Sequence, residues 1–166
     1  MTGASNSTFL SGELNARIES ATLQDLPELV EILLDLMNSG MDFLPDPEKH
    51  ERALQLILEE PGRGRIFVIR SEDKIIGMVN LLFTISTAEG GFVAQMEDVI
   101  IRPEHRGVGY GSLLLNHVLD FCAKKDFLRI TLLTDKISAE SQKFFRKHGF
   151  DYSNMIPMRR WLKGRV

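Results

Sequence analysis

The sequence has a single cysteine, no long hydrophobic run and no excess of basic residues. Cys122 is the only cysteine among 166 residues, so an internal disulfide is excluded, and we expect an ordinary core thiol. No apolar run approaches the roughly 20 residues that a membrane-spanning helix needs. The formal net charge is −3, which gives no basic field for nucleic acid or an acidic membrane. We therefore expect no nucleic-acid partner, no membrane association and a cytoplasmic location.

Metal chemistry is also not expected, and the composition is that of a globular domain. No set of His, Cys and carboxylate residues has the spacing of a metal site. Hydrophobic residues make up 43% and charged residues 26% of the chain, an ordinary globular balance. Residues 1–15 are small and polar, and they are predicted to form a flexible tail. Residues 16–166 are long enough for one domain with a substantial core.

The pattern of apolar residues predicts alternating strands and helices. Strands are predicted over residues 16–22, 65–70, 74–85, 92–102 and 128–134, with a closing hairpin over 150–162. Helices are predicted over residues 22–40, from Asp46 to about 60, from the glycines near 110 to Lys124, and from Ser138 to Gly149. This order indicates a mixed α/β (α+β) fold, with a central sheet of six to seven strands flanked by about four helices.

Three glycines at the start of one helix raise the possibility of a bound phosphate. In "IIRPEHRGVGYGSLLLNHVL", residues 100–119, Gly107, Gly109 and Gly111 separate a β-branched run from a helical pattern. A helix N-terminus offers unpaired N–H groups and partial positive charge, and glycines let a phosphate approach them closely. Three basic residues share this turn and are expected to add positive charge to it, namely Arg102, His105 and Arg106. The alternative is a tight strand-to-helix turn without a ligand.

The spacing of these glycines excludes two common nucleotide motifs. Neither a dinucleotide G-x-G-x-x-G nor a Walker G-x-x-x-x-G-K-[ST] is present, so neither NAD nor ATP is favoured. The segments "EDVIIRPEHRGVGYGSLLL" and "ITLLTDKISAESQKFFRKHGF" instead resemble the GNAT superfamily of acyl-CoA-dependent N-acetyltransferases. The resemblance covers about residues 16–162 in the right element order. It implies a partly splayed sheet and a single N-acetyltransferase domain over residues 16–166.

The resemblance also implies acetyl-CoA as cosubstrate and a set of coenzyme-binding residues. In this family the pantetheine arm lies beside the central strand, and the pyrophosphate sits on the N–H groups of the glycine turn. Carried over, the arm would lie beside Val99, Ile100 and Ile101. The remaining coenzyme-binding positions would be Arg106, Gly107, Val108, Gly109, Tyr110, Gly111, Ser112 and Ser138.

Two adjacent acids on the central strand are candidates for the amine chemistry. Glu97 and Asp98 are neighbours on an otherwise apolar strand, so they are predicted to point to opposite faces. We expect Glu97 to be the general base or an amine-binding group. The alternative for this acid is a structural salt bridge or hydrogen bond within the sheet.

The group that protonates the coenzyme A thiolate is less clear from the resemblance. Phe145 occupies the position where family members usually have the acidic tyrosine, and a phenyl ring cannot donate a proton. Tyr152, Ser141 or Tyr110 could substitute, or solvent could protonate the thiolate. We take Tyr152 as the substitute acid. A non-catalytic acyl-CoA-binding or regulatory domain remains an alternative.

The acceptor is expected to be a primary amine on a small molecule, acetylated by direct attack in a ternary complex. A protein N-terminus or lysine is the alternative acceptor. The resemblance places the acceptor site near residues 37–50, where Asp42 would suit an amine and Asp46 is expected to cap a helix. The last strand of such folds often pairs across a dimer, so a homodimer is plausible.

Overall fold

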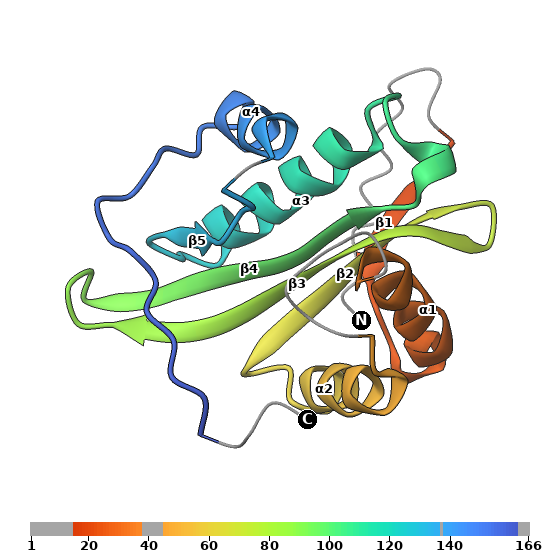
Figure 1. Cartoon of the computed structure of the whole chain (residues 1–166), viewed down its shortest axis with the longest axis horizontal. Coiled ribbons are helices and arrows are strands. Elements are labelled where there is room, and N and C mark those ends of the chain that lie inside the picture. Colours follow the sequence, from red (N-terminus) through yellow and green to blue (C-terminus); the bar gives the residue numbers. More distant parts are fainter. Residues whose placement is uncertain (1–14, 38–44, 137, 163–166) are drawn as a thin grey trace, which may run out of the picture. The chain divides into compact units, whose positions relative to one another are not determined.

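A computed structural model describes residues 15–37, 45–136 and 138–162 (Figure 1). The chain divides into two units, one ending at Leu133 and the other beginning at Thr134. The first unit contains the sheet and three of the helices, and the second contains one helix and an extended segment. The expected tail over residues 1–15, apart from Asn15, lies outside the described residues.

Among its described residues, the first unit is built on one five-stranded sheet. Its strands follow chain order, as β1 (Arg17–Ser20), β2 (Gly64–Ser71), β3 (Lys74–Ser86), β4 (Gly91–Ile101) and β5 (Ile130–Leu132). The first three pairings are antiparallel, and β4 pairs with β5 in parallel (Figure 1). The parallel step requires a crossover, which α3 supplies.

The predicted sheet of six to seven strands is wrong, because residues 150–162 form no strand. The expected closing hairpin has no regular secondary structure in this segment. Its apolar side chains Met155, Ile156, Met158 and Leu162 are at least 82% exposed. β-Propensity reflects packing on a pleated, half-buried surface, so an apolar pattern without such a surface does not define a strand.

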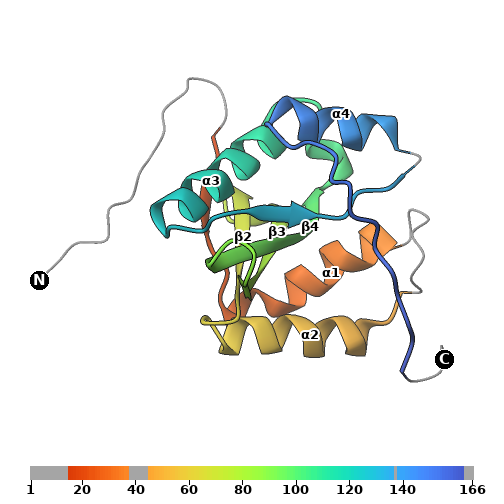
Figure 2. The same cartoon turned by 90° about the vertical axis from the view of Figure 1, so that its left-hand side faces the viewer.

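In the described part of the chain, four α-helices accompany these strands. They are α1 (Leu26–Met37), α2 (Pro47–Glu59), α3 (Tyr110–Lys124) and α4 (Ala139–Lys147), with short 3₁₀ helices at Leu23–Asp25 and Pro103–His105. Figure 2 shows α1 and α2 on one face of the sheet and α3 on the other. Asp46 caps α2 as expected, since its Oδ1 accepts from the Lys49 N–H at 3.1 Å. Within the described residues, no helix combines the length and the apolar character needed to cross a membrane.

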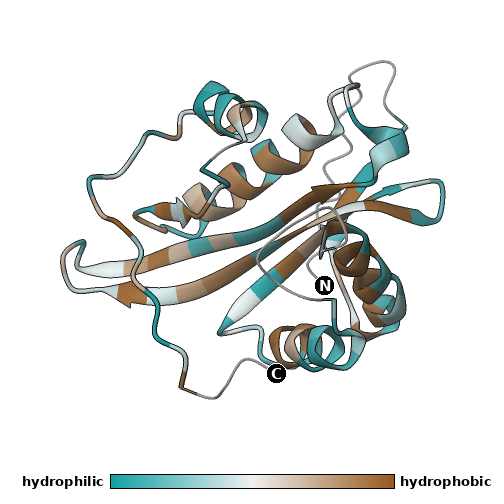
Figure 3. Ribbon diagram, in the orientation of Figure 1, coloured by the Kyte–Doolittle hydropathy of each residue, from teal (hydrophilic) through white to brown (hydrophobic). Residues whose placement is uncertain are grey.

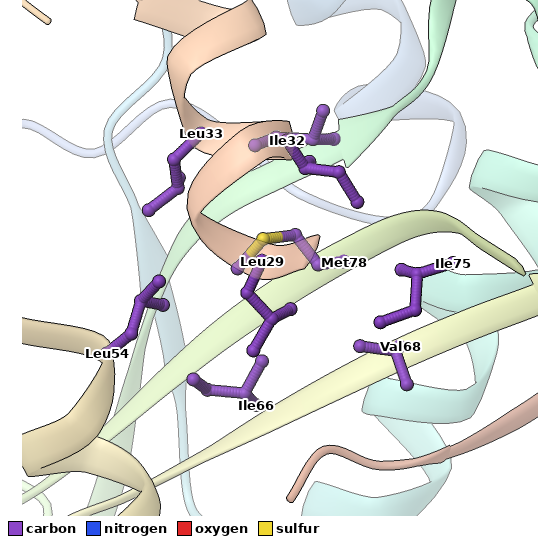
Figure 4. Packing of buried hydrophobic residues seen from close by; sticks show 9 residues of the cluster. Leu29, Ile32, Leu33, Leu54, Ile66, Val68, Ile75 and Met78 are labelled. Atoms are coloured by element: carbon purple, nitrogen blue, oxygen red, sulfur yellow. The ribbon is translucent and has the colours of Figure 1, made fainter. Parts of the chain in front are cut away.

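A hydrophobic core fills the space between the sheet and the pair α1 and α2. Figure 3 shows hydrophobic residues along these helices and the central strands, and Figure 4 shows how they pack. The cluster consists of Leu29, Ile32, Leu33, Leu54, Ile66, Val68, Ile75, Met78 and Ile100, each at most 4% exposed. Because neighbouring strands and two helices share this cluster, it fixes α1 and α2 against the strands that carry the site.

The opposite face of the sheet packs against α3. The buried residues of α3 are Leu114, Leu115, Val118 and Cys122. Cys122 is 3% exposed, and burial raises its thiol pKa to about 11, as expected of a core thiol. The Phe67 ring of β2 meets the Phe121 ring edge-on at 5.0 Å.

The second unit contains α4 and its two caps, both as predicted. The Ser138 Oγ accepts from the Ser141 N–H at 3.3 Å at the start of α4. Gly149 follows the helix with a φ of 85°, and the Phe150 N–H donates to the Phe145 carbonyl. The Phe145 and Phe150 rings meet edge-on at 5.9 Å, the hydrophobic contact that accompanies such a glycine cap.

An ion-pair network fastens β2 to the segment that begins α1. Arg70 is 11% exposed in its side chain and bonds Asp25 and Glu19. Burial opposes ionisation of Asp25, but hydrogen bonds from the Thr22 N–H and from Arg70 hold its pKa below the ordinary value of 3.8. The ionised carboxylate therefore stabilises the fold.

We expect Asp25→Asn to lower the free energy of unfolding by about 2 kcal/mol near neutral pH, since a hydrogen bond between charged groups contributes roughly 1.5–3 kcal/mol. The folded pKa is depressed, so this contribution is present above the unfolded value and is lost as pH falls through the folded one. Urea unfolding should therefore show a larger deficit at about pH 7 than at about pH 3. An equal deficit at both pH values would contradict the role of the charge.

Candidate functional site

The sheet opens between β4 and β5 halfway along β4. The two strands pair only over Ala94–Met96 and Ile130–Leu132. β4 continues to Ile101, but no described residue of β5 pairs with it beyond Met96. The edge of β4 from Glu97 to Ile101 therefore has no strand of the described residues beside it, and Figure 1 shows β4 running on beyond β5.

A β-bulge in β4 accompanies this opening. Asn80 of β3 lies opposite Glu97 and Met78 lies opposite Ile100, so Val79 faces two residues of β4. One of these two residues, Asp98, has a φ of 52°, in the left-handed region. A bulge bends its strand and increases the local twist, which explains why β4 departs from β5 directly after Met96.

The bulge corrects the prediction that Glu97 and Asp98 point to opposite faces. Glu97 and Asn80 are direct cross-strand partners, so their side chains share one face. The Asn80 Nδ2 donates to the Asp98 Oδ2 at 2.6 Å, so Asp98 reaches the same face. Alternation along a strand assumes regular extended backbone, and the left-handed Asp98 interrupts it. Both acids therefore lie together.

The two acids differ in burial and in their partners. Glu97 is exposed, and its Oε1 accepts from the Gln95 Nε2 at 2.6 Å. Asp98 is half-buried, and burial raises the pKa of its carboxyl above 3.8, with a further rise from the nearby charge of Glu97. The hydrogen bond from Asn80 and the charge of His50 on α2 oppose this rise. In the described part of the chain, neither acid forms an ion pair.

The glycine turn joins the end of β4 to the start of α3. Gly107 and Gly109 have φ values of 80° and 108°, and Gly109 is the N-cap residue of α3. No side chain caps this helix, and the Leu113 N–H bonds the Gly109 carbonyl at 3.0 Å. The Arg106 N–H bonds the Pro103 carbonyl at 3.2 Å, so the N–H groups from Gly107 to Ser112 are the ones available to an anion. Gly111 lies within the helix without a positive φ, so backbone conformation does not explain it.

The basic residues near this turn are only partly directed at it. Arg102 bonds the Ile75 carbonyl at 2.9 Å and pairs with Glu31 and Asp35 of α1, which neutralise its charge. The Arg106 Nε donates to the Ile101 carbonyl at 2.7 Å, which ties the turn back to β4. The expectation that all three basic residues add positive charge to the turn therefore fails for Arg102.

The residues expected to bind the coenzyme fall in both units. Val99, Ile100 and Ile101 lie on the free part of β4 and lead directly into the glycine turn, where Val108 is 58% exposed. The side chain of Ile100 belongs to the core, so only its backbone could meet a ligand. The other expected positions of the first unit are Arg106, Gly107, Gly109, Tyr110, Gly111 and Ser112, all in the turn or the first turn of α3.

The expected residues of the second unit have partners within that unit. Ser138 Oγ lies 2.9 Å from Ser141 Oγ and acts as the helix cap. The Tyr152 hydroxyl donates to the Gln142 Oε1 at 2.6 Å, and the residue as a whole is 67% exposed. Phe145 holds the helix end through Phe150.

Sequence reasoning missed two side chains that bond the acids, Asn80 and Gln95, and the charge of His50, which acts on Asp98. Asn80 is the polar interruption in "KIIGMVNLLFTI", and this signal alone could have singled it out. Gln95 lies two residues before Glu97 on the predicted strand, so alternation could have placed both on one face. The contribution of His50 depends on helix packing, which leaves no local pattern. Asp42, Phe43 and Leu44, expected near the acceptor, lie outside the described residues.

The open β4 edge, followed by the glycine turn, agrees with the partly splayed sheet that the family resemblance implies. The chain belongs to the acetyltransferase (GNAT) family, whose model matches residues 27–150.

Two curated relatives and one solved structure illustrate this membership. The chain is 22% identical to an uncharacterised N-acetyltransferase of Methanocaldococcus jannaschii, over 88% of this chain and 64% of that protein. It is 28% identical to the glucosamine 6-phosphate N-acetyltransferase of Trypanosoma brucei brucei, over 52% of this chain and 57% of that protein. The chain thus spans less than two thirds of either relative. A possible acetyltransferase from Clostridium difficile 630 shares the fold, with a TM-score of 0.79 and 16% identity over 92% of this chain and 100% of that chain.

Asp98→Asn should become relatively more stable than the parent as pH rises from about 4 to about 8. The folded pKa of Asp98 is raised, so its favourable contribution is present at low pH and is lost as pH rises through that pKa. Asparagine also tolerates the left-handed backbone. Urea unfolding across this range is the measurement. Asp25→Asn is the control, because its stability relative to the parent should fall as pH rises. If both variants changed in the same direction with pH, the raised pKa of Asp98 would be refuted.

Proposed function

We propose that this protein transfers the acetyl group of acetyl-CoA to a primary amine on a small molecule, by direct attack in a ternary complex. The observation that carries the proposal is the bulge at Asp98, which frees the edge of β4 and leads it into the glycine turn. Membership of the acetyltransferase family supports the same reaction. An arm with amide groups needs backbone donors and acceptors, and an unpaired strand edge offers both.

The residues of the first unit fit the coenzyme. Two positive-φ glycines and an uncapped helix N-terminus suit a pyrophosphate, because N–H groups and the helix dipole favour bound anions. In our proposal, residues 106–112 hold this group and Val99, Ile100 and Ile101 lie beside the pantetheine arm. Bound acetyl-CoA supplies the thioester carbonyl that the amine attacks.

Glu97 is the proposed base or amine-binding group. An amine is a nucleophile only after losing its extra proton, and a carboxylate within reach can accept it directly or through water. Glu97 is exposed, is held by Gln95 and forms no ion pair in the described part of the chain, so its charge is available to an amine. The acidic character of the bulge favours a cationic acceptor group.

Protonation of the leaving thiolate is assigned to Tyr152 or to solvent. Tyr152 is the substitute for the tyrosine that Phe145 replaces. A thiol has a pKa near 8.5, so its thiolate is a tolerable leaving group even when only water protonates it. The missing tyrosine also supports a second candidate, a regulatory domain that binds acyl-CoA without catalysis.

The acceptor and the assembly complete the proposal. A curated relative is named for a glucosamine 6-phosphate substrate, which supports a small-molecule amine over a protein N-terminus or lysine. A homodimer and a cytoplasmic location are part of the proposal. The deciding experiment measures free thiol released from acetyl-CoA with a panel of primary amines. Turnover favours the enzyme, whereas coenzyme binding without turnover favours the regulatory candidate.

Gly109→Ala should weaken acetyl-CoA binding by more than tenfold. A Cβ on this backbone strains the turn and displaces N–H groups, and one hydrogen bond to a charged group contributes about 1.5–3 kcal/mol. Isothermal titration calorimetry measures the affinity.

Gly90→Ala is the matched control, because Gly90 also has a positive φ, of 77°, but lies in the turn between β3 and β4. Both variants should lose similar stability, and only Gly109→Ala should lose affinity. Equal affinity in the two variants would mean that the glycines serve only the turn.

Glu97→Gln should reduce kcat by at least about 100-fold, the usual lower range for losing a general base. Coenzyme affinity should stay unchanged, because Glu97 precedes the pantetheine-binding residues. Steady-state kinetics over pH tests this, with Glu89→Gln at the hairpin turn as control. Full turnover of Glu97→Gln across pH would remove Glu97 from the mechanism.

A further inference from the structure

Asn80 is a buried polar side chain that packing alone does not explain. It is 4% exposed and lies on β3 among apolar neighbours. Its Oδ1 has no hydrogen-bond partner within the described residues. A buried polar atom without a partner costs stability, and an apolar side chain of similar size would avoid that cost. Retaining an amide here therefore points to a role beyond filling space.

The amide serves one strained acid of the bulge. Its Nδ2 donates to the Asp98 Oδ2 at 2.6 Å, and Asp98 carries a left-handed φ of 52°. Residues in sparsely populated backbone regions persist when their surroundings fix them, and they concentrate at functional sites. Asn80 is also the cross-strand partner of Glu97, so one side chain adjoins both acids.

We propose that Asn80 is a positioning residue for acetyl transfer, which holds the Asp98 carboxyl beside Glu97 so that both acids meet the acceptor amine together. The inference deepens the proposed function and rests on it. In this arrangement Gln95 orients Glu97, and Asn80 orients Asp98. Each carboxyl has its own amide, and neither is drawn into an ion pair in the described part of the chain.

The pair has a defined task in proton transfer. One N–H bond of the acceptor ammonium breaks, its proton forms an O–H bond with a carboxylate oxygen of the pair, and the nitrogen keeps the electron pair for attack. Two neighbouring carboxylates resist being ionised together, so the pair takes up one proton readily, and the acid left without it keeps its charge. Among the described residues, the charged groups acting on Asp98 are Glu97 of β4 and His50 of α2, so the pH profile reports these groups together.

Asn80→Leu tests the role directly. It should lower kcat/KM by about 100-fold, the scale of a misplaced catalytic group. It should also move the acid limb of the kcat/KM profile to higher pH, because the hydrogen bond that favours ionised Asp98 is lost. A uniform loss of activity with an unmoved acid limb would overturn the proposal. Asn116→Leu, an exposed change on α3, is the control and should alter neither value.

A swap separates positioning from structure. The double variant Asn80→Asp with Asp98→Asn keeps the hydrogen bond between the two positions, with donor and acceptor exchanged. The Tm of this double variant should therefore lie close to the parent value. Its carboxylate has moved from β4 to β3, so its activity should be low. Recovery of activity together with Tm would show a purely structural pair. This variant also decides the matter if Asn80→Leu does not fold.

Failure of the proposed function is recognised separately. If the parent turns over no amine, acetyl transfer to such amines fails. A titration of the Asp98 carboxyl followed by carbon-13 NMR still tests the positioning. The pH of its midpoint should be higher in Asn80→Leu than in the parent. An unchanged midpoint would overturn the inference even where the parent is active.

Discussion

The bulge at Asp98 is the constraint on which the site depends. A regular β4 would pair with β5 along more of its length and would place Glu97 and Asp98 on opposite faces. The extra residue opposite Val79 bends the strand, ends the pairing with β5 at Met96 and turns both acids to one face. An open backbone edge and an acidic pair thus have a single physical cause, and removing the bulge would remove both.

Local signals were sufficient for much of the fold. Asp46 before Pro47, Ser138 and Gly149 mark helix ends through short-range hydrogen bonds, and the structure has each of them. The glycine turn after a strand could be predicted for the same reason. Glycine has no Cβ and adopts the positive φ found at Gly107 and Gly109 without a steric penalty. These features depend on a few neighbouring residues, so the sequence alone predicts them.

The features that were not predictable depend on pairing between distant segments. The bulge is defined by the register of Asn80 against Glu97, and no pattern within β4 marks it. Positive φ is uncommon for any residue other than glycine, so an aspartate in a strand does not signal it, although aspartate is enriched in that region. The segment 150–162 has the composition of a strand but forms none in the structure. Strand count and the direction of single side chains are therefore the weakest conclusions from sequence, and the direction of Asp98 is the one that matters most here.

The distribution of charge explains why the bulge acids remain available. Arg70 is occupied by Asp25 and Glu19, and Arg102 by Glu31 and Asp35. Both arginines are thus committed to attaching α1 and the segment before it, and in the described part of the chain neither pairs with Glu97 or Asp98. Glu97 and Asp98 are held instead by neutral amides, which fix their direction without cancelling their charge. An amide partner keeps a carboxylate both oriented and basic, whereas an arginine would stabilise its ionised form and make it a poorer proton acceptor. A site that must take a proton from an ammonium is better served by this arrangement.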